Sequence, residues 1–115
     1  MAGDAFDTIH RFWEIQDHGD YSALAPLFSD DAQVVDPVYG TFTGGEAIAG
    51  FMSMMNVEMG KIGATFRLVE MDGDDHTAWA QWEVTTTDGR PPRHGVGVYR
   101  VSHGQLTYYK DYMNA

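Results

Sequence analysis

The chain has 115 residues, with seven Lys and Arg against seventeen Asp and Glu, which gives a formal net charge of −10. It has no cysteine, so a disulfide framework, a thiolate zinc site and a cysteine nucleophile are excluded. The scattered cations disfavour nucleic acid as a partner, and no apolar stretch reaches the ~18 residues that cross a bilayer. We expect one domain, residues 1–115, that is soluble and cytoplasmic.

The first half of the chain predicts three helices. Apolar residues recur at helical spacing over Asp4–His18, and Asp20 is a suitable N-cap for a short second helix. A strand at Ala32–Pro37 and a Gly-rich loop at 38–45 follow, and Glu46 opens a third helix.

The second half predicts a sheet, because the apolar period changes from 3.6 to 2 after residue 63. We expect four strands joined by hairpins, namely Ala64–Met71, Thr77–Thr87, Arg93–Ser102 and Gln105–Met113. Helices segregated from such a run indicate an α+β domain. We expect a cone-shaped, curved antiparallel sheet wrapped around a long N-terminal helix and two shorter helices. A cone of this kind is a natural pocket for a small molecule.

Two segments, 28–40 (FSDDAQVVDPVYG) and 44–51 (GGEAIAGF), resemble the nuclear-transport-factor-two-like superfamily. The ketosteroid-isomerase-like and SnoaL-like polyketide cyclase members are the most similar, and the element order agrees over the whole chain. The resemblance implies the cone fold. It leaves the activity open, because the superfamily contains isomerases, cyclases, epoxide hydrolases, dehydratases and non-catalytic binding domains.

Two aspartates are the candidate catalytic residues. The resemblance places Asp36 where ketosteroid isomerase has its general base, although an Asp-Pro pair also ends strands in ordinary turns. Asp111 resembles the working acid on the last strand of SnoaL-like cyclases, and alternation points it inward together with Tyr109. The alternative for Asp111 is an exposed carboxylate paired with Lys110 or with a cross-strand Arg.

The resemblance also shows departures from the known catalytic patterns. The isomerase needs two oxyanion donors, and their places are taken here by Phe12 and Gly97, whose side chains donate nothing. Arg93 is similar to an arginine that orients the acid or a substrate oxygen in epoxide hydrolases. The acid that should follow two residues later is replaced by Gly95, so that triad is incomplete.

The alternation expected for the long strand points Trp79 and Glu83 into the cone. It points the opposite set outward as a homodimer face, namely Ala80, Trp82 and Val84. Glu83 has a second interpretation, as a structural ion pair with Arg93.

These considerations predict an enzyme-like domain that binds a small hydrophobic molecule. The expected chemistry is cofactor-free proton transfer next to a carbonyl, of isomerase or cyclase type, with Asp36 or Asp111 as the base and Tyr109 or Arg93 as the electrophilic partner. The alternative is a non-catalytic binding or dimerisation module. No metal site is expected from the five histidines. The expected binding residues are Phe12, Trp13, Phe28, Tyr39, Phe51, Met55, Phe66, Trp79, Glu83, Arg93 and Tyr109.

Overall fold

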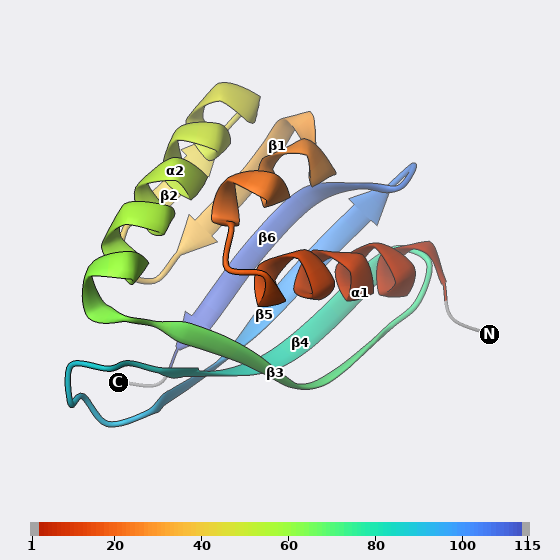
Figure 1. The fold of residues 1–115 in the computed structure, drawn as a ribbon. Coiled ribbons are helices and arrows are strands. Elements are labelled where there is room, and N and C mark those ends of the chain that lie inside the picture. Colours follow the sequence, from red (N-terminus) through yellow and green to blue (C-terminus); the bar gives the residue numbers. More distant parts are fainter. Residues whose placement is uncertain (1–2, 114–115) are drawn as a thin grey trace.

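The helices lie on one face of a single sheet in the computed structural model, which describes residues 3–113 (Figure 1). Their bounds are α1 Asp4–Asp17, the 3-10 helix η1 Tyr21–Leu27 and α2 Gly45–Ile62. In α1 the buried positions 5, 8, 9, 12 and 13 form one stripe that faces the sheet. The Asp20 side chain accepts a hydrogen bond from Ser22 N and so begins η1. Helix α2 ends at Gly63, which has φ 61°.

Six strands form one curled, unclosed sheet. Its order is β2-β1-β6-β5-β4-β3. The strands are β1 Phe28–Asp36, β2 Gly40–Thr43, β3 Thr65–Gly73, β4 Thr77–Thr85, β5 Arg93–Ser102 and β6 Gln105–Met113. All neighbouring pairs are antiparallel except β1 and β6, which are parallel. A register shift between Leu68 and Glu70 marks a bulge in β3.

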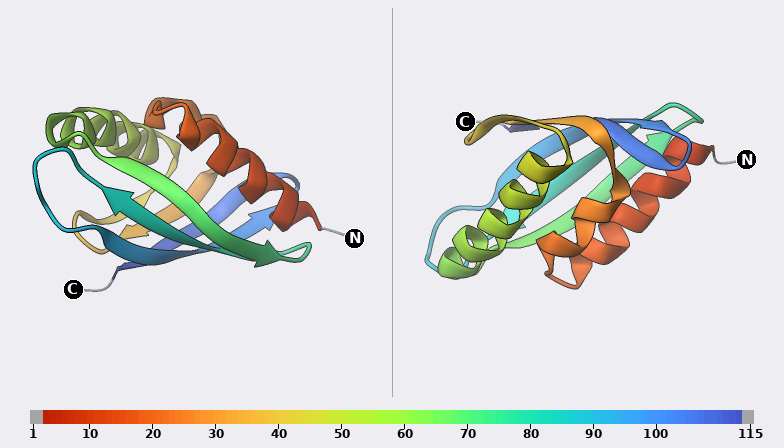
Figure 2. Two further views of the ribbon diagram at one scale, coloured as in Figure 1. Left: turned by 60° about the horizontal axis from the view of Figure 1, so that its bottom comes forward. Right: turned by 90° about the horizontal axis from the view of Figure 1, so that it is seen from above.

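The helices cover the concave face of the sheet (Figure 2), and the hydrophobic core is built from side chains of both layers. Helices α1 and η1 contribute fully buried side chains such as Phe12 and Leu24, and the strands contribute Val34, Tyr99 and Leu106. The packing therefore follows one helix layer on one sheet layer. No described helix has the length and apolar character needed to span a membrane.

The α+β fold class and the curved sheet predicted from the sequence are confirmed, with three differences of detail. The loop expected at 38–45 contains β2, a four-residue strand with mostly exposed residues. Helix α2 has 18 residues against 14 in α1, so the N-terminal helix is not the longest. The pairing of β1 with β6 makes the sheet mixed instead of purely antiparallel.

Candidate functional site

The open side of the cone holds a cavity with two compartments. The inner one, between the three helices and the sheet, has a volume of about 40 Å³, which is enough for a few water molecules. The outer one, towards the β1–β2 turn and the β4–β5 loop, has about 390 Å³, within the range of small-molecule sites. Both compartments are lined by Asp36, Met55, Phe66, Trp82 and Asp111.

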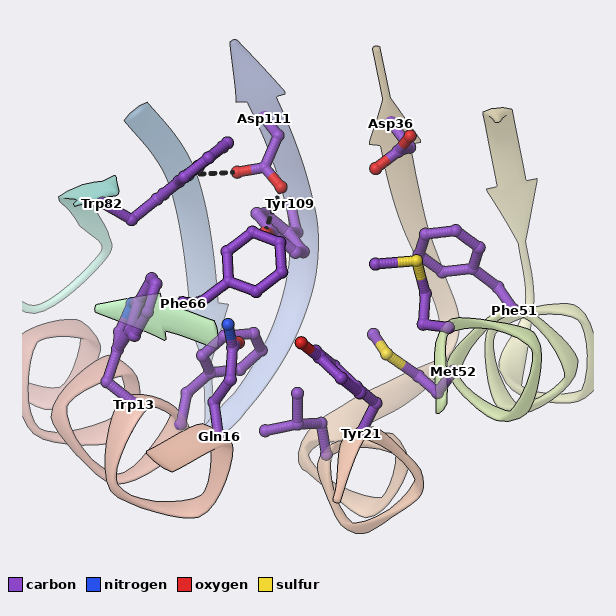
Figure 3. Close-up of a pocket in the computed structure, with 13 residues that line it drawn as sticks. Trp13, Gln16, Tyr21, Asp36, Phe51, Met52, Phe66, Trp82, Tyr109 and Asp111 are labelled. Atoms are coloured by element: carbon purple, nitrogen blue, oxygen red, sulfur yellow. Dashed lines mark hydrogen bonds between the residues drawn. The ribbon is translucent and has the colours of Figure 1, made fainter. Parts of the chain in front are cut away.

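Asp111 lies on the inner face of β6 at the junction of the two compartments (Figure 3). Its Oδ1 accepts a hydrogen bond from Trp82 Nε1 at 3.1 Å, and its Oδ2 accepts one from the Tyr109 hydroxyl. Burial raises the pKa of Asp111 to about 7, with a smaller upward contribution from the charge of Asp36, while the two hydrogen bonds oppose the shift. This carboxyl is therefore able to gain and lose a proton near neutral pH.

A chain of aromatic side chains supports Asp111 from behind. The rings of Tyr109 and Tyr99 stack with centroids 4.7 Å apart, and Trp13 Nε1 donates to the Tyr99 hydroxyl at 3.3 Å. Burial, followed by the charge of Asp111, raises the pKa of both tyrosines well above the ordinary value. Both phenols therefore stay protonated, and Tyr109 acts as a permanent donor to Asp111.

Asp36, at the end of β1, lines the cavity and also caps the turn that follows it. Its Oδ2 accepts hydrogen bonds from the backbone N–H groups of Val38 and Tyr39, each at 2.9 Å. The Asp36 side chain therefore has the positions of both interpretations of the Asp-Pro pair, since it lines the cavity and also caps a turn. Figure 3 shows the carboxyls of Asp36 and Asp111 on facing sides of the cavity.

The structure brings most of the expected binding residues to the cavity. The inner compartment is lined by Phe12, Trp13, Phe51, Met55, Phe66 and Tyr109. Tyr39 and Arg93 line the outer one. Phe28 lines neither compartment. It lies behind Phe12 in the core, with ring centroids 6.5 Å apart.

The register expected for β4 is wrong by one residue. Ala80 and Trp82 are buried on the inner face, and Val84 lines the outer compartment, so these three residues are no dimer face. Trp79 is 37 % exposed on the opposite face. The reason is that Trp82 pairs with Gly95 of β5, and residues directly opposite each other in a pair share a face.

Glu83 lies on the outer face with Trp79, and it does not pair with Arg93. Its Oε1 is 3.2 Å from Arg67 Nη2, and its Oε2 is 3.7 Å from His94 Nε2. Trp79 and Glu83 are therefore removed from the set of candidate binding residues. The groups that hold Asp111 are Tyr109 and Trp82, and no ion pair links it to Arg93 among the described residues.

Two polar residues of the cavity were not among the sequence candidates. Gln16 of α1 and Tyr21 of η1 both line the inner compartment and point towards its centre in Figure 3. Within residues 3–113 the Tyr21 hydroxyl has no hydrogen-bond partner, and burial raises its pKa to about 12. The sequence offered two indications for these residues, namely the helical stripe that includes Gln16 and the predicted N-cap at Asp20. Neither predicts that Tyr21, the first residue of η1, points into the cavity.

The two positions that carry oxyanion donors in the isomerase pattern carry none here. Phe12 is 1 % exposed, and its ring meets those of Tyr99 and Tyr109 edge to face. A Cβ at Gly97 would lie 2.5 Å from the Tyr99 hydroxyl oxygen and 3.0 Å from Asp111 Oδ1. A donor side chain at position 97 is therefore incompatible with the Tyr99 and Asp111 positions seen here.

The family is decided by a match of residues 9–109 to the model of the SnoaL-like domain. The chain belongs to the SnoaL-like family. No curated protein sequence matches it significantly. No group of three His, Asp or Glu side chains in a metal-binding arrangement occurs within residues 3–113.

Solved structures of SnoaL-like and related proteins share the fold at low sequence identity. An NTF2-like protein of unknown function from Mesorhizobium loti is 21% identical, with a TM-score of 0.81 and coverage of 97% of this chain and 92% of that one. A proposed polyketide cyclase from Sinorhizobium meliloti is 17% identical, with a TM-score of 0.76 and coverage of 92% and 94%. A proposed ketosteroid isomerase from Kribbella flavida is 14% identical, with a TM-score of 0.80 and coverage of 97% and 78%. These likenesses concern the fold alone.

Proposed function

We propose that this SnoaL-like protein is a cofactor-free enzyme that moves a proton next to the carbonyl of a small, mainly apolar molecule. The observation that carries the proposal is the Asp111 carboxyl, held at the junction of the two compartments by Tyr109 and Trp82 and facing Asp36. A base is most effective when its pKa lies near the working pH, and burial gives Asp111 such a pKa.

The residues around the cavity support one sequence of events. The Asp111 carboxylate takes a proton from the carbon next to the carbonyl, and the C–H electron pair forms the enolate. The Tyr21 hydroxyl, which stays protonated, donates a hydrogen bond to the oxygen on which the charge develops. In an isomerisation Asp111 returns the proton to another carbon. In a cyclisation the enolate carbon attacks a second carbonyl instead, the electron pair of that C=O bond moves to its oxygen, and this oxygen takes the proton from Asp111.

Asp36 has a supporting part in this scheme. Its Oδ2 is already engaged by two backbone N–H groups, and its charge contributes to the raised pKa of Asp111. Asp36 remains the alternative base through Oδ1, for which no hydrogen bond is found within the described residues. Separate Asn substitutions of the two residues distinguish these roles.

The test is a ligand screen with steroid-like, aromatic polyketide and terpenoid carbonyl compounds, followed by turnover of the Asp111→Asn and Asp36→Asn variants. We expect turnover of at least one class and a loss of about 10²–10⁴-fold in Asp111→Asn. Unchanged turnover in Asp111→Asn removes that residue from the mechanism. Binding without turnover in all three classes supports the alternative, a binding module, which the donor-free positions Phe12 and Gly97 favour.

The chain is further proposed to form a homodimer through the outer face of the sheet. This face exposes Trp79, Val96 and Tyr112, which are 37 %, 36 % and 52 % exposed. Trp79 of β4 pairs with Val98 of β5, and Val96 of β5 pairs with Tyr112 of β6, so the apolar side chains of the three strands are close neighbours. Exposed aromatic and aliphatic side chains gathered on one sheet face of a small domain are typical of a subunit interface.

A further inference from the structure

Positive charge is scarce in this chain, and three of its seven Lys and Arg side chains are in ion pairs within residues 3–113. Arg67 is paired with Glu83, Lys61 with Glu58 and Arg90 with Asp88, at N–O distances of 3.2, 3.2 and 2.8 Å. Arg100 and Lys110 lie over the rings of Tyr108 and Tyr112. Within residues 3–113 the Arg93 side chain has no hydrogen bond, ion pair or ring contact, although it lines the outer compartment.

Two acidic groups of the same compartment have partners other than Arg93. Glu58 is held by Lys61, and the Oδ2 of Asp36 accepts two backbone N–H groups. Arg90, the other cation on the lining, is bound to Asp88. Arg93 is therefore the cation on this lining that has no ion-pair partner among the described residues, and an anion is its natural partner.

The position of Arg93 along β5 also fixes a direction. Arg93, Gly95 and Gly97 share the inner face of this strand, and Gly97 pairs with Asp111. At about 3.3 Å per residue, the Cα atoms of Arg93 and Gly97 are ~13 Å apart. The cation thus lies towards the mouth of the outer compartment, and Asp111 lies at its inner end, where the two compartments meet, with the Trp82 ring packed over Gly95 between them.

We propose that the natural ligand is an apolar carbonyl compound of about bicyclic size that carries a carboxylate at the end away from the reacting carbon, with this carboxylate bound by Arg93. The part that concerns the reacting carbon rests on the function proposed above. The planar guanidinium presents two parallel N–H donors, which match the two oxygens of a carboxylate. The inner end of the outer compartment is lined by Asp111 and aromatic rings, where a second negative charge is costly, so the ligand anion faces the mouth.

The experiment compares two ligands of the same shape, 2-naphthoate and 2-naphthamide, by isothermal titration calorimetry. The proteins are the wild type, Arg93→Gln, Arg93→Lys and the control Arg67→Gln, whose side chain lies outside both compartments. We expect the wild type and the control to bind the naphthoate about tenfold more tightly than the amide. Arg93→Gln should bind both ligands equally, and Arg93→Lys should keep part of the preference.

Two results overturn this inference. The first is equal affinity of the wild type for both ligands, and the second is a preference that survives in Arg93→Gln or is lost equally in Arg67→Gln. Thermal unfolding of each variant verifies that it is folded. Because the readout is binding, failure here leaves the role of Asp111 in turnover unaffected. Conversely, unchanged turnover in Asp111→Asn overturns the proposed chemistry and leaves the carboxylate site in place.

Discussion

Trp82 on β4 donates a hydrogen bond to Asp111 on β6, at 3.1 Å, although β5 lies between the two strands. The indole reaches that far because its ring lies over Gly95. A Cβ built at Gly95 would be 2.2 Å from Trp82 Cζ2, a distance that no side chain tolerates. The absence of a side chain on β5 is therefore a condition for the orientation of the candidate base.

We predict that Gly95→Ala displaces the Trp82 ring and costs about 1–3 kcal/mol in the free energy of unfolding, as overpacking does in other cores. The measurement is urea denaturation followed by circular dichroism. The matched control is Gly50→Ala in the middle of α2, where an added Cβ meets nothing within 4 Å. The control should stabilise the protein by ~0.5–1 kcal/mol. Equal stability of Gly95→Ala and the wild type would show that the ring does not need this space.

The same glycine explains why only part of the site could be predicted from the sequence. Alternation placed Tyr109 and Asp111 correctly on the inner face of β6, because that strand is regular from Tyr108 onward. It failed on β4, where both faces carry a tryptophan and the pattern itself has no preferred side. The neighbouring strand β5 decides which tryptophan faces inward, because Gly95 leaves room for the Trp82 ring, whereas Trp79 pairs with Val98.

Two further features of the fold depend on tertiary context. Strand β2 consists of Gly40–Thr43, whose residues are mostly exposed, so it has no apolar alternation that a sequence pattern could reveal. The inward direction of Tyr21 depends on Asn56 of α2, whose Oδ1 accepts a hydrogen bond from Tyr21 N at 2.8 Å. This contact spans 35 residues of sequence, and no local rule anticipates it.

The raised pKa of Asp111 predicts a specific dependence of stability on pH. The folded state holds this proton with a pKa of about 7 and the unfolded state with the ordinary value of 3.8. The folded state therefore binds more protons between about pH 4 and pH 7, and its stability falls as the pH rises through this range. Asparagine resembles the protonated carboxyl and does not titrate, so in Asp111→Asn the fall in stability that Asp111 causes with rising pH should be absent.

The measurement is urea denaturation of the wild type and Asp111→Asn at pH 4.5 and pH 8. We expect the free energy of unfolding of Asp111→Asn, relative to that of the wild type, to increase from pH 4.5 to pH 8 by an amount on the order of a few kcal/mol. A constant difference between the two proteins would show that Asp111 titrates at its ordinary pKa. Asp74 and Asp88, whose pKa values are lowered by hydrogen bonds, are common to both proteins and cancel in the comparison.

Two substitutions of Asp36 separate its structural role from its chemical one. Asn keeps an oxygen that accepts from Val38 N and Tyr39 N, whereas Ala removes it. We expect Asp36→Ala to lose about 0.5–2 kcal/mol of stability and Asp36→Asn to stay within ~0.5 kcal/mol of the wild type. Thermal denaturation measures both. If Asp36→Ala is as stable as the wild type, the turn does not depend on this cap.

The proposed dimer predicts a change of assembly when a charge is placed on the outer face. Trp79→Lys puts an ammonium group among Val96, Val98 and their neighbours, and a desolvated charge without a partner opposes association. We expect the wild type to elute as a dimer and the variant as a monomer in size-exclusion chromatography with light scattering. The control is Val57→Lys on the exposed side of α2. A wild type that is monomeric at all concentrations contradicts the proposal.

Tyr109 offers a test of how the candidate base is tuned. Its hydroxyl donates to Asp111, and this hydrogen bond lowers the pKa of that carboxyl against the larger effect of burial. Tyr109→Phe removes the donor but keeps a ring that can stack on Tyr99. We expect the pKa of Asp111 to rise further, which carbon-detected NMR of the labelled carboxyl measures directly. The pH at which turnover reaches half its maximum should rise by the same amount, because the base must be ionised to accept a proton.

The control is Tyr108→Phe, on the outer face beneath Arg100, which should leave both the pKa of Asp111 and the pH dependence of turnover unchanged. If Tyr109→Phe alters the size of the turnover but not its pH dependence, Tyr109 acts through packing and not through the proton of Asp111.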